Sequence, residues 1–433
     1  MGKRLKVLTL GCKANFADSA SVVRLAAAEG YEVVPPASPA DVVVINTCTV
    51  THRADRDSRS LARKARRENP CSTVILTGCY AQMSLPERDK IPEVDHWVGS
   101  FPWESQGNGE GTLAGILRGV SGNRAGTAVG LSDYGADLLL GHRRTFLKIQ
   151  DGCDSSCAYC VVPLARGRSR SVPEEEVIAR AVGAEADGAR ELVLTGIHIG
   201  LYGDDFRRKD VLAGLVVRLL RETSRARIRL SSIEPAELTL PLIDTIAGEP
   251  RVCAHLHVPL QSGSDRTLAR MRRPYGCAGY GKAVSEAASR IPGLSLGTDV
   301  IVGFPGETAG DFKETVSFLA DSPVTYMHVF PYSARPGTES ARFPDDVSPA
   351  EKKRRVSALR VLDSRMRDAF LSRQVGTTAD VLAEEADRAR GELTGHSGNY
   401  AVVVFPGAPS DVGEIHRVVV ENVRDGKLAG TRA

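Results

Sequence analysis

The segment that decides the fold is Cys153-Asp154-Ser155-Ser156-Cys157-Ala158-Tyr159-Cys160, in which three cysteines follow a C-x3-C-x2-C spacing. It comes directly after the strand-like run Phe146-Leu147-Lys148-Ile149-Gln150. Three thiolates can bind only three irons of a four-iron cubane, so the fourth iron has no protein ligand and can bind a small molecule. Catalytic metal sites generally keep one such open coordination position. A structural zinc loop is the alternative, but it needs four ligands, usually in two pairs, and the nearest histidine, His142, precedes the strand. The spacing therefore favours a catalytic iron–sulfur cluster.

A second group of cysteines follows three apolar runs near the start of the chain. Residues 5–10, 41–46 and 73–77 each precede a cysteine by two positions, and those cysteines are Cys12, Cys48 and Cys79. The runs have the length of buried strands and alternate with helical stretches at about 18–29 and 54–68, which predicts a parallel α/β sheet. Because ligands bind at the carboxyl ends of such strands, the three thiols should share one rim. They could instead be ordinary small buried residues; their common placement favours a second cluster with an open iron.

The remaining composition fits an enzyme of the cytoplasm. The chain has 433 residues, a length that suits two to four domains of roughly 100–200 residues each. Of these residues 42% are hydrophobic, and the net charge is +3. Nine cysteines is an odd number, and the chain starts with Lys-Arg and a strand rather than a signal sequence, so we expect no disulfide framework. We interpret Cys71, Cys253 and Cys277 as ordinary residues. No apolar run approaches 18 residues, so we expect no membrane span.

The middle of the chain reads as repeated strand–helix units. The expected strands are 145–150, 191–195, 227–231, 254–258, 298–302 and 326–330. Barrels built from such units carry their active sites at the carboxyl ends of the strands. The polar and glycine-containing motifs of this chain fall at those ends, as the cysteine segment after the first strand does. A glycine-rich stretch, 105–126, is expected to be a loop that joins this domain to the first.

The C-terminal segment has a different pattern. Short strand-like runs at 378–383, 399–405 and 415–420 are separated by Gly, Pro and Asp, which predicts a small β-barrel. A charged stretch, 351–368, is expected to be a helix that divides it from the central domain. We thus expect domains at 1–120, 140–370 and 374–433. Contact with RNA would need a basic surface on the last of them.

Several motifs together resemble one known family. Leu10-Gly11-Cys12-Lys13-Ala14-Asn15, Asn46-Thr47-Cys48-Thr49-Val50-Thr51 and Thr77-Gly78-Cys79 are similar to the N-terminal domain of the radical S-adenosylmethionine (SAM) methylthiotransferases. The similarity continues through Gln150-Asp151-Gly152-Cys153, Pro163-Leu164-Ala165-Arg166-Gly167, Leu260-Gln261-Ser262-Gly263-Ser264 and Gly303-Phe304-Pro305-Gly306-Glu307, over nearly the whole chain. Among the branches, the motifs are most similar to the one that acts on N6-threonylcarbamoyladenosine (t6A) in tRNA. One departure is Asp18, where relatives often have Glu.

The resemblance implies a fold and cofactors. It implies a partial (β/α)6 radical SAM barrel between an N-terminal parallel α/β domain and a C-terminal β-barrel similar to the RNA-binding TRAM domain. Two [4Fe-4S] clusters are expected, one on Cys153, Cys157 and Cys160 and one on Cys12, Cys48 and Cys79, with SAM chelated by the open iron of the first. Tyr159 should lie near the adenine of SAM, and Thr195, Ser232, Glu234 and Gln261 should line the SAM pocket, although each could equally cap a turn. Asp299 and Arg335 should face the same rim.

The resemblance also implies a reaction. An adenine C2–H bond is too inert for acid–base side chains, so cofactors carry such radical chemistry. One SAM would methylate a sulfur at the N-terminal cluster, and another would be cleaved at the central cluster to a radical that activates C2. The substrate would be an unpaired t6A in a tRNA anticodon loop, which an enzyme must take out of its stack. Lys13 and Arg166 are the candidate contacts for the t6A carboxylate. The implied partners are a low-potential electron donor such as a flavodoxin or ferredoxin, and a sulfur source; we expect a monomer.

Three alternatives remain open at this point. The same chemistry could act on isopentenyl-adenosine in tRNA or on an aspartate of a ribosomal protein. A radical SAM enzyme could use its second cluster for something other than sulfur insertion. The chain could also be a non-catalytic, metal-bound RNA-binding protein, which predicts indifference to Cys157→Ala.

Overall fold

The computed structural model describes residues 2–84, 91–99, 111–121, 131–207 and 211–433. At the N-terminus, five parallel strands form one sheet in the order β2-β1-β3-β4-β5. Their bounds are β1 Arg4–Thr9, β2 Glu32–Val33, β3 Val42–Thr47, β4 Thr73–Gly78 and β5 His96–Trp97. Helices α1 (Lys13–Ala28) and α4 (Leu113–Ser121) cover one face, and α2 (His52–Glu68) and α3 (Cys79–Met83) the other. The predicted parallel α/β domain is confirmed.

The predicted helices and loop need two adjustments. Helix α1 begins at Lys13 rather than near residue 18, because Cys12 takes the extended N-cap position although its side chain makes no capping bond. The start of α1 therefore lacks a capping side chain that could be recognised in the sequence. Helix α2 has one, because the Thr51 side chain accepts a hydrogen bond from the Ala54 amide. The expected loop 105–126 contains helix α4; its residues 105–110 and 122–126 lie outside the described residues.

Six parallel strands form the central barrel. They are β6 (Thr145–Lys148), β9 (Glu191–Thr195), β10 (Arg227–Leu230), β11 (His255–His257), β12 (Ser295–Val302) and β13 (Tyr326–Pro331). They pair as β10-β9-β6 and β11-β12-β13, and parallel bridges from Ile228 to Val252 and from Ser232 to His257 connect the two sets. No pairing joins β6 to β13 among the described residues, so the barrel is partial.

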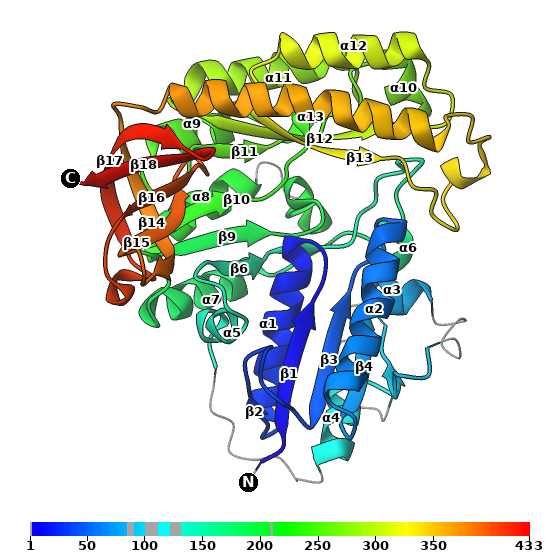
Figure 1. Ribbon diagram of the computed structural model, residues 1–433, viewed down its shortest axis with the longest axis vertical. Helices are drawn as coiled ribbons and strands as arrows, with labels where there is room; N and C mark the ends of the chain where they lie inside the picture. The colour runs from blue at the N-terminus through cyan, green and yellow to red at the C-terminus, as the bar shows by residue number, and fades with distance from the viewer. Residues whose placement is uncertain (1, 85–90, 100–110, 122–130, 208–210) are drawn as a thin grey trace.

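The N-terminal domain lies against the barrel at β6. Figure 1 shows α1 beside β6 and β9, at the boundary between the two domains. Phe16 and Ala17 of α1 pack against Phe146 of β6 and Val193 of β9, which form a small apolar cluster. Residues on the other face of these strands, such as Leu147 and Leu192, pack against the helices that surround the barrel. The barrel wall therefore presents one face to its helices and the other to α1 and the lumen.

The helices around the barrel follow its strands in order. They are α5 (Asp133–Leu139), α7 (Glu174–Ala186), α8 (Val211–Glu222), α9 (Leu240–Gly248), α10 (Asp265–Arg270), α11 (Cys277–Arg290), α12 (Ala309–Ala320) and α13 (Pro349–Ser372), with α6 (Val162–Arg166) and the ribbon β7 (Gln150–Asp151) and β8 (Arg170–Ser171) near the cysteine segment. Helix α13 is longer than the predicted 351–368 because Ser348 caps it and Pro349 occupies its first turn. No helix in the described ranges is long and apolar enough to cross a membrane.

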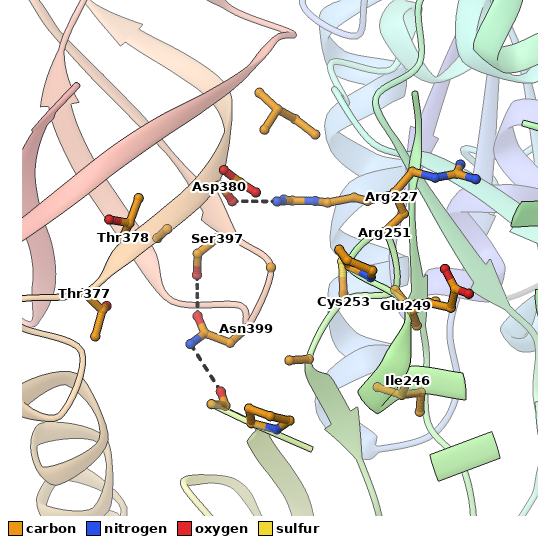
Figure 2. A pocket seen from close by; sticks show the side chains of 18 of the residues that line it. Arg227, Ile246, Glu249, Arg251, Cys253, Thr377, Thr378, Asp380, Ser397 and Asn399 are labelled. Atoms are coloured by element: carbon orange, nitrogen blue, oxygen red, sulfur yellow. Dashed lines mark hydrogen bonds between the residues drawn. The ribbon is translucent and has the colours of Figure 1, made fainter. Parts of the chain in front are cut away.

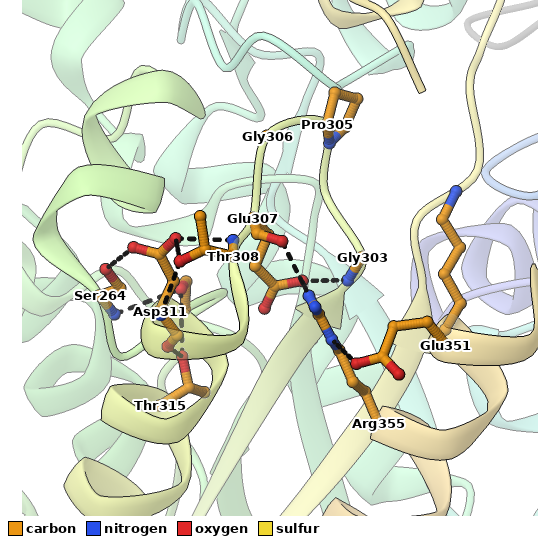
Figure 3. Close-up of polar contacts among 12 residues, drawn as sticks. Ser264, Gly303, Pro305, Gly306, Glu307, Thr308, Asp311, Thr315, Glu351 and Arg355 are labelled. Atoms are coloured by element: carbon orange, nitrogen blue, oxygen red, sulfur yellow. Dashed lines mark hydrogen bonds and ion pairs between the residues drawn. The ribbon is translucent and has the colours of Figure 1, made fainter. Parts of the chain in front are cut away.

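The loop Gly303–Glu307 after β12 is held from outside the barrel. Figure 3 shows the Glu307 carboxylate between the Gly303 amide and the Arg355 guanidinium of α13. The Arg355 Nη1 to Glu307 Oε2 distance is 2.8 Å, and both side chains are buried. The motif thus fixes the carboxyl end of β12 through an ion pair with the last helix of the domain.

A closed five-stranded barrel ends the chain, in the order β14-β15-β16-β18-β17. Its strands are β14 (Thr378–Asp387), β15 (Glu392–Ser397), β16 (Val402–Pro406), β17 (Ile415–Arg424) and β18 (Lys427–Arg432). The β-barrel prediction is confirmed, although β15 and β18 were not foreseen. Strand β16 starts at Val402 rather than at 399, because Tyr400 occupies a turn with a φ of 67°.

Two arginines of β10 bind this small barrel to the amino-terminal ends of the central strands. Arg227 donates to the carbonyls of Asp380 and His396, and Arg229 donates to those of Ser397 and Gly398. Figure 2 shows the Arg227–Asp380 bond across the cleft between the two domains. The loop that carries Tyr400 is thereby positioned at the mouth of the central barrel.

Candidate functional site

One cavity at the carboxyl ends of the barrel strands contains the three cysteines of the central segment. Cys153, Cys157 and Cys160 line it. The predicted SAM residues Tyr159, Ser232, Glu234 and Gln261 line it too, and so do Ile197, His198 and Arg273. Thr195 is not part of this lining; it ends β9 two residues before Ile197, and its buried hydroxyl has no hydrogen-bond partner in the described chain. The structure thus brings four of the five predicted SAM residues to the cysteines.

Hydrogen-bond donors surround the three sulfurs. Arg273 Nη1 lies 3.2 Å from Cys157 Sγ, and the Ser155 amide lies 3.4 Å from Cys153 Sγ. His198 Nδ1 is 3.6 Å from Cys153 Sγ, and its Nε2 is 2.5 Å from Glu237 Oε1. Donors to cluster sulfurs are one of the means by which proteins tune cluster potential.

Burial raises the pKa of one thiol at this site, whereas hydrogen bonds lower the pKa of another. Burial raises the pKa of Cys160 to about 12, with the neighbouring Cys157 adding to it. Burial also opposes ionisation of Cys153, but hydrogen bonds from His198 and Ser155 outweigh it and lower the pKa of that thiol. The same contacts with Cys153 and Glu237 overcome burial and raise the pKa of His198 to about 10. The contacts of His198 with Glu237 and Cys153 thus favour the charged form of its imidazole beside the Cys153 sulfur.

Gln261 and Glu234 are fixed within the cavity wall. Gln261 has a φ of 70°, which is rare for a residue other than glycine. Two backbone bonds hold it there, from its amide to the Asp299 carbonyl (2.8 Å) and from the Ile301 amide to its own carbonyl (2.9 Å). Glu234 forms an ion pair with Arg273, whose side chain is buried. Strained backbone of this kind is characteristic of ligand sites.

The other three cysteines meet at one edge of the N-terminal sheet. Its strand order, 2-1-3-4-5, places a topological switch point between β1 and β3, where such sheets bind ligands. Cys12 and Cys48 follow those two strands, and Cys79 begins α3 directly after β4. Burial, together with the charges of Cys12 and Cys79, raises the pKa of Cys48 to about 12, so the three thiols are close neighbours. Gly11 allows this approach: a Cβ there would lie 2.8 Å from Cys48 Cβ.

A buried guanidinium on α6, the helix that follows one group of cysteines, reaches a cysteine of the other group. Arg166, six residues after Cys160, donates from Nε to Cys79 Sγ at 3.3 Å. It also donates to Asn15 Oδ1 (2.5 Å), Asp18 Oδ2 (2.8 Å) and Asp151 Oδ1 (3.0 Å). Four of its N–H bonds are thus engaged by protein. Its contact with substrate stays a prediction, and the four bonds tie its guanidinium to the Cys79 sulfur and to buried polar groups of the domain boundary.

Lys148 and Arg335 complete the contact between the domains. Lys148 Nζ pairs with Asp18 (2.5 Å) and Asp151 (3.0 Å), which gives each carboxylate two cations. Arg335 donates from Nη2 to Thr49 Oγ1 (2.8 Å) and Asp55 Oδ2 (2.6 Å). Arg335 therefore binds the segment after Cys48 to the barrel rim rather than lining the SAM cavity.

The residues in both places fit iron–sulfur clusters. Each site offers three thiols as soft ligands, placed at the ends of parallel strands or in the loop after one. Burial raises the pKa of Cys48, Cys79 and Cys160, which disfavours their thiolates in the free protein, a cost that metal binding offsets. Donors from Arg166 and Arg273 reach one sulfur of each site. Helix α3, which begins with Cys79, packs against α6, which begins two residues after Cys160, so the two groups of cysteines belong to neighbouring elements.

Sequence reasoning missed Arg273 and His198. Arg273 sits in the run Met271-Arg272-Arg273, which reads as a solvated pair of arginines, and His198 lies in the loop after β9. Nothing in their local sequence separates them from surface residues. Asp299, predicted at the rim, lies beside His257 and His328, and the ligand atoms of the three are within 4.8 Å of one another.

Comparison with known proteins matches this architecture domain by domain. The description "Uncharacterized protein family UPF0004" matches residues 4–99, "Radical SAM superfamily" matches 147–319, and "TRAM domain" matches 372–431. The chain is 37% identical to the threonylcarbamoyladenosine tRNA methylthiotransferase MtaB of Bacillus subtilis, over 95% of this chain and 92% of that protein. The chain belongs to the radical SAM methylthiotransferase family.

Further relatives of this methylthiotransferase span two named activities. The threonylcarbamoyladenosine tRNA methylthiotransferase MtaB of Aquifex aeolicus is 36% identical, over 95% of this chain and 98% of the relative. The tRNA-2-methylthio-N(6)-dimethylallyladenosine synthase of Chlorobium luteolum is 32% identical, over 100% of this chain and 97% of the relative. As a radical SAM enzyme, the methylthiotransferase uses SAM and [4Fe-4S] chemistry.

Among solved structures, the methylthiotransferase shares its fold with the radical SAM methyltransferase TsrM from Kitasatospora setae. The TsrM structure with cobalamin and a [4Fe-4S] cluster gives a TM-score of 0.56 at 15% identity, covering 78% of this chain and 77% of that one. The likeness confirms the arrangement of an α/β domain and a radical SAM barrel.

Proposed function

We propose that this methylthiotransferase adds a methylthio group to C2 of t6A at position 37 of tRNA, giving ms2t6A. The observation that carries the proposal is the pair of three-cysteine sites, with Arg166, which follows Cys160 in the chain, donating to Cys79 of the other site. A reaction that adds both sulfur and a methyl group at an unactivated carbon needs two such centres next to each other. Relatives named for threonylcarbamoyladenosine, at 37% and 36% identity, support t6A as the substrate.

In this proposal the two sites divide the chemistry. Cys153, Cys157 and Cys160 would hold one [4Fe-4S] cluster with SAM, and Cys12, Cys48 and Cys79 the other. When bound, these groups supply the radical activation of C2 and the sulfur and methyl that are transferred. Tyr159, Ser232, Glu234 and Gln261 would bind SAM, with Thr195 at the edge of the pocket.

The protein's own residues orient and isolate the reacting groups. Arg166 and Arg273 hold one sulfur of each site in a defined position. Phe16 and Ala17 of α1 pack against Phe146 and Val193, so this helix covers part of the barrel and would limit the entry of water. Excluding water protects a radical reaction from side reactions.

We assign the three units separate tasks in this function. Residues 1–120 would carry the sulfur-donating cluster, 140–370 the SAM chemistry, and 374–433 the binding of RNA. The target base would leave the anticodon stack to enter the lumen. A low-potential donor such as a flavodoxin or ferredoxin would reduce the clusters, and a separate source would supply sulfur. The enzyme would act as a monomer in the cytoplasm, where its tRNA is found.

Anaerobic reconstitution tests both centres. With iron, sulfide and SAM, the wild-type chain should bind about eight irons and convert a t6A anticodon stem-loop to a product heavier by one methylthio group. Cys48→Ala and Cys157→Ala should each keep about four irons and form no product, whereas Cys71→Ala, an exposed thiol, should match the wild type. About four irons in the wild-type chain would refute the second cluster.

A second candidate substrate has its own support. The relative named tRNA-2-methylthio-N(6)-dimethylallyladenosine synthase is 32% identical over the whole chain, which favours isopentenyl-adenosine as the alternative. Stem-loops that carry t6A or isopentenyl-adenosine should be compared at equal concentration. Faster conversion of the isopentenyl RNA would overturn the t6A assignment and leave the chemistry intact.

A further inference from the structure

Lys13 places a cation without an anionic partner beside the barrel lumen. It is the first residue of α1, next to Cys12, and its Nζ lies 5.6 Å from the centre of the Tyr400 ring. Its side chain is only partly exposed, and no hydrogen bond or ion pair to it occurs among the described residues. A shielded ammonium of this kind costs free energy unless an anion compensates it.

The surroundings of Tyr400 carry an excess of positive charge. Arg144 and Arg229 also face its ring, at 5.5 Å and 4.9 Å from the ring centre. Arg144 pairs with Glu384 at 2.8 Å, and Arg229 shares Glu191 with Arg227 at 2.6 Å. Four cations thus meet two carboxylates: Lys13, Arg144, Arg227 and Arg229 against Glu191 and Glu384. Two positive charges are left for a ligand to neutralise.

A continuous row of polar and aromatic side chains leads from Tyr400 to the SAM cavity. The Tyr400 ring lies 4.6 Å from the ring of His255, whose Nε2 is 2.8 Å from the Tyr326 hydroxyl. The Tyr326 ring is 6.2 Å from that of His257, and His257 Nδ1 is 2.9 Å from the hydroxyl of Ser232, which lines the SAM cavity. The row therefore joins the two places through the lumen.

Two buried ring nitrogens indicate that this row faces a ligand. His255 Nδ1 and His257 Nε2 are buried and have no hydrogen-bond partner in the described chain, although Asp299 Oδ1 is 3.3 Å from the latter. Gly297 of β12 makes the room for Tyr326, since a Cβ there would lie 2.1 Å from the tyrosine ring. Unsatisfied buried nitrogens on one wall are groups that a base with several donors and acceptors can satisfy.

We propose that Lys13, Arg144 and Tyr400 bind the carboxylate of the threonyl group of t6A, with the adenine lying along His255 and His257 towards the SAM cavity. The proposal rests on t6A being the substrate. The ammonium and guanidinium supply charge-assisted bonds to the carboxylate, and the tyrosine hydroxyl supplies one further donor. The site is built from three domains, so the C-terminal barrel provides a substrate contact in the lumen in addition to any surface for RNA.

Binding of three labelled anticodon stem-loops to the reconstituted full chain tests the site. They carry t6A, the methyl ester of t6A, and unmodified adenosine at position 37. The wild-type chain should bind t6A RNA about 10-fold to 100-fold more tightly than the ester, the range expected for hydrogen bonds between charged groups. Lys13→Gln should bind both equally, Lys13→Arg should restore the preference, and Lys313→Gln, on the exposed side of α12, should match the wild type.

Arg144→Gln and Tyr400→Phe provide independent variants in case Lys13→Gln lowers iron content through its neighbour Cys12. Each should reduce the preference for t6A over its ester. If the wild-type chain binds acid and ester equally, or if Lys13→Gln weakens all three RNAs by the same factor, the cations contact phosphate or nothing and the proposal is wrong. A wild-type chain that prefers t6A RNA but yields no methylthio product would overturn the proposed function and leave the carboxylate site supported.

Discussion

Replacing Arg166 with methionine should destabilise the N-terminal domain and its cluster site together. The side chain is 1% exposed and pairs with Asp18 and Asp151, which are also buried. Although burial disfavours its charge, Asp18, Cys79 and Asp151 raise the pKa of Arg166 above its usual value, so the guanidinium stays ionised. Methionine would leave Asp18 facing only Lys148, and Asp151 facing Lys148 and the more distant Arg170 at 3.9 Å. Removal of one partner from a buried ion pair costs about 3–5 kcal/mol.

Tryptophan fluorescence can measure this loss in the right part of the molecule. The chain has two tryptophans, Trp97 and Trp103, and both belong to the N-terminal third. Trp97 lies in β5, so its emission follows unfolding of the sheet that carries the cysteines. In urea, under anaerobic conditions, the Arg166→Met transition should move to lower denaturant by an amount equal to about 3–5 kcal/mol.

Two comparisons separate the network from a general effect of losing an arginine. Arg218→Met removes the ion pairs of a partly exposed arginine with Glu174 and Glu175 at the surface and should leave the transition nearly unchanged. After reconstitution, Arg166→Met should lose iron to a chelator in two phases, with about half leaving faster than in the wild type. A loss of less than about 1 kcal/mol, with a single slow phase of iron release, would refute the reasoning.

Three further results are expected. Arg273→Met, which removes the donor to Cys157 Sγ, should weaken SAM binding at least about 10-fold, measured by equilibrium dialysis; unchanged affinity with full iron content would contradict it. Arg335→Met should break the bond to Asp55 and increase protease cleavage between the first two domains at constant iron content; an unchanged cleavage pattern would count against this contact. Although burial would raise it, Lys148 and Arg166 lower the pKa of Asp151 from 3.8 to about 2, so the stabilisation it gives is present above about pH 4 and is lost as pH falls towards 2; the wild-type chain should lose more stability across that window than Asp151→Asn, in which only other carboxylates with a lowered pKa, such as Glu191 and Asp311, still respond.

Most of the strands could be predicted because their signal is local. Residues 191–195 were predicted as a strand and form β9 over the same range, and 227–231 became β10 at Arg227–Leu230. In contrast, β15, with the sequence Glu-Leu-Thr-Gly-His-Ser, has few apolar residues and is a strand because it pairs with β14 and β16. Pairing between segments distant in the chain leaves little trace in either segment alone.

The candidate site likewise contains residues that the sequence predicted and residues that it did not. The three-cysteine sites followed from the spacing of Cys153, Cys157 and Cys160 and from the strand ends before Cys12, Cys48 and Cys79. Arg273 and His198 did not follow, because an arginine or histidine in a loop looks the same whether it faces water or a sulfur. Their partners, Cys157 and Cys153, are 116 and 45 positions away.

The sequence alone determined which strands run parallel, where each ends, and therefore which cysteines could share a site, because hydrophobic periodicity and turn residues act over a few positions. Only the tertiary structure decided how the sites relate. It brought Asp18 to Lys148, 130 positions apart, set Arg166 on Cys79, and turned Lys13 towards Tyr400 of the last domain. Those contacts arise when the three domains pack together. The shape and charge of each packed surface exist only after the domain that carries it has folded.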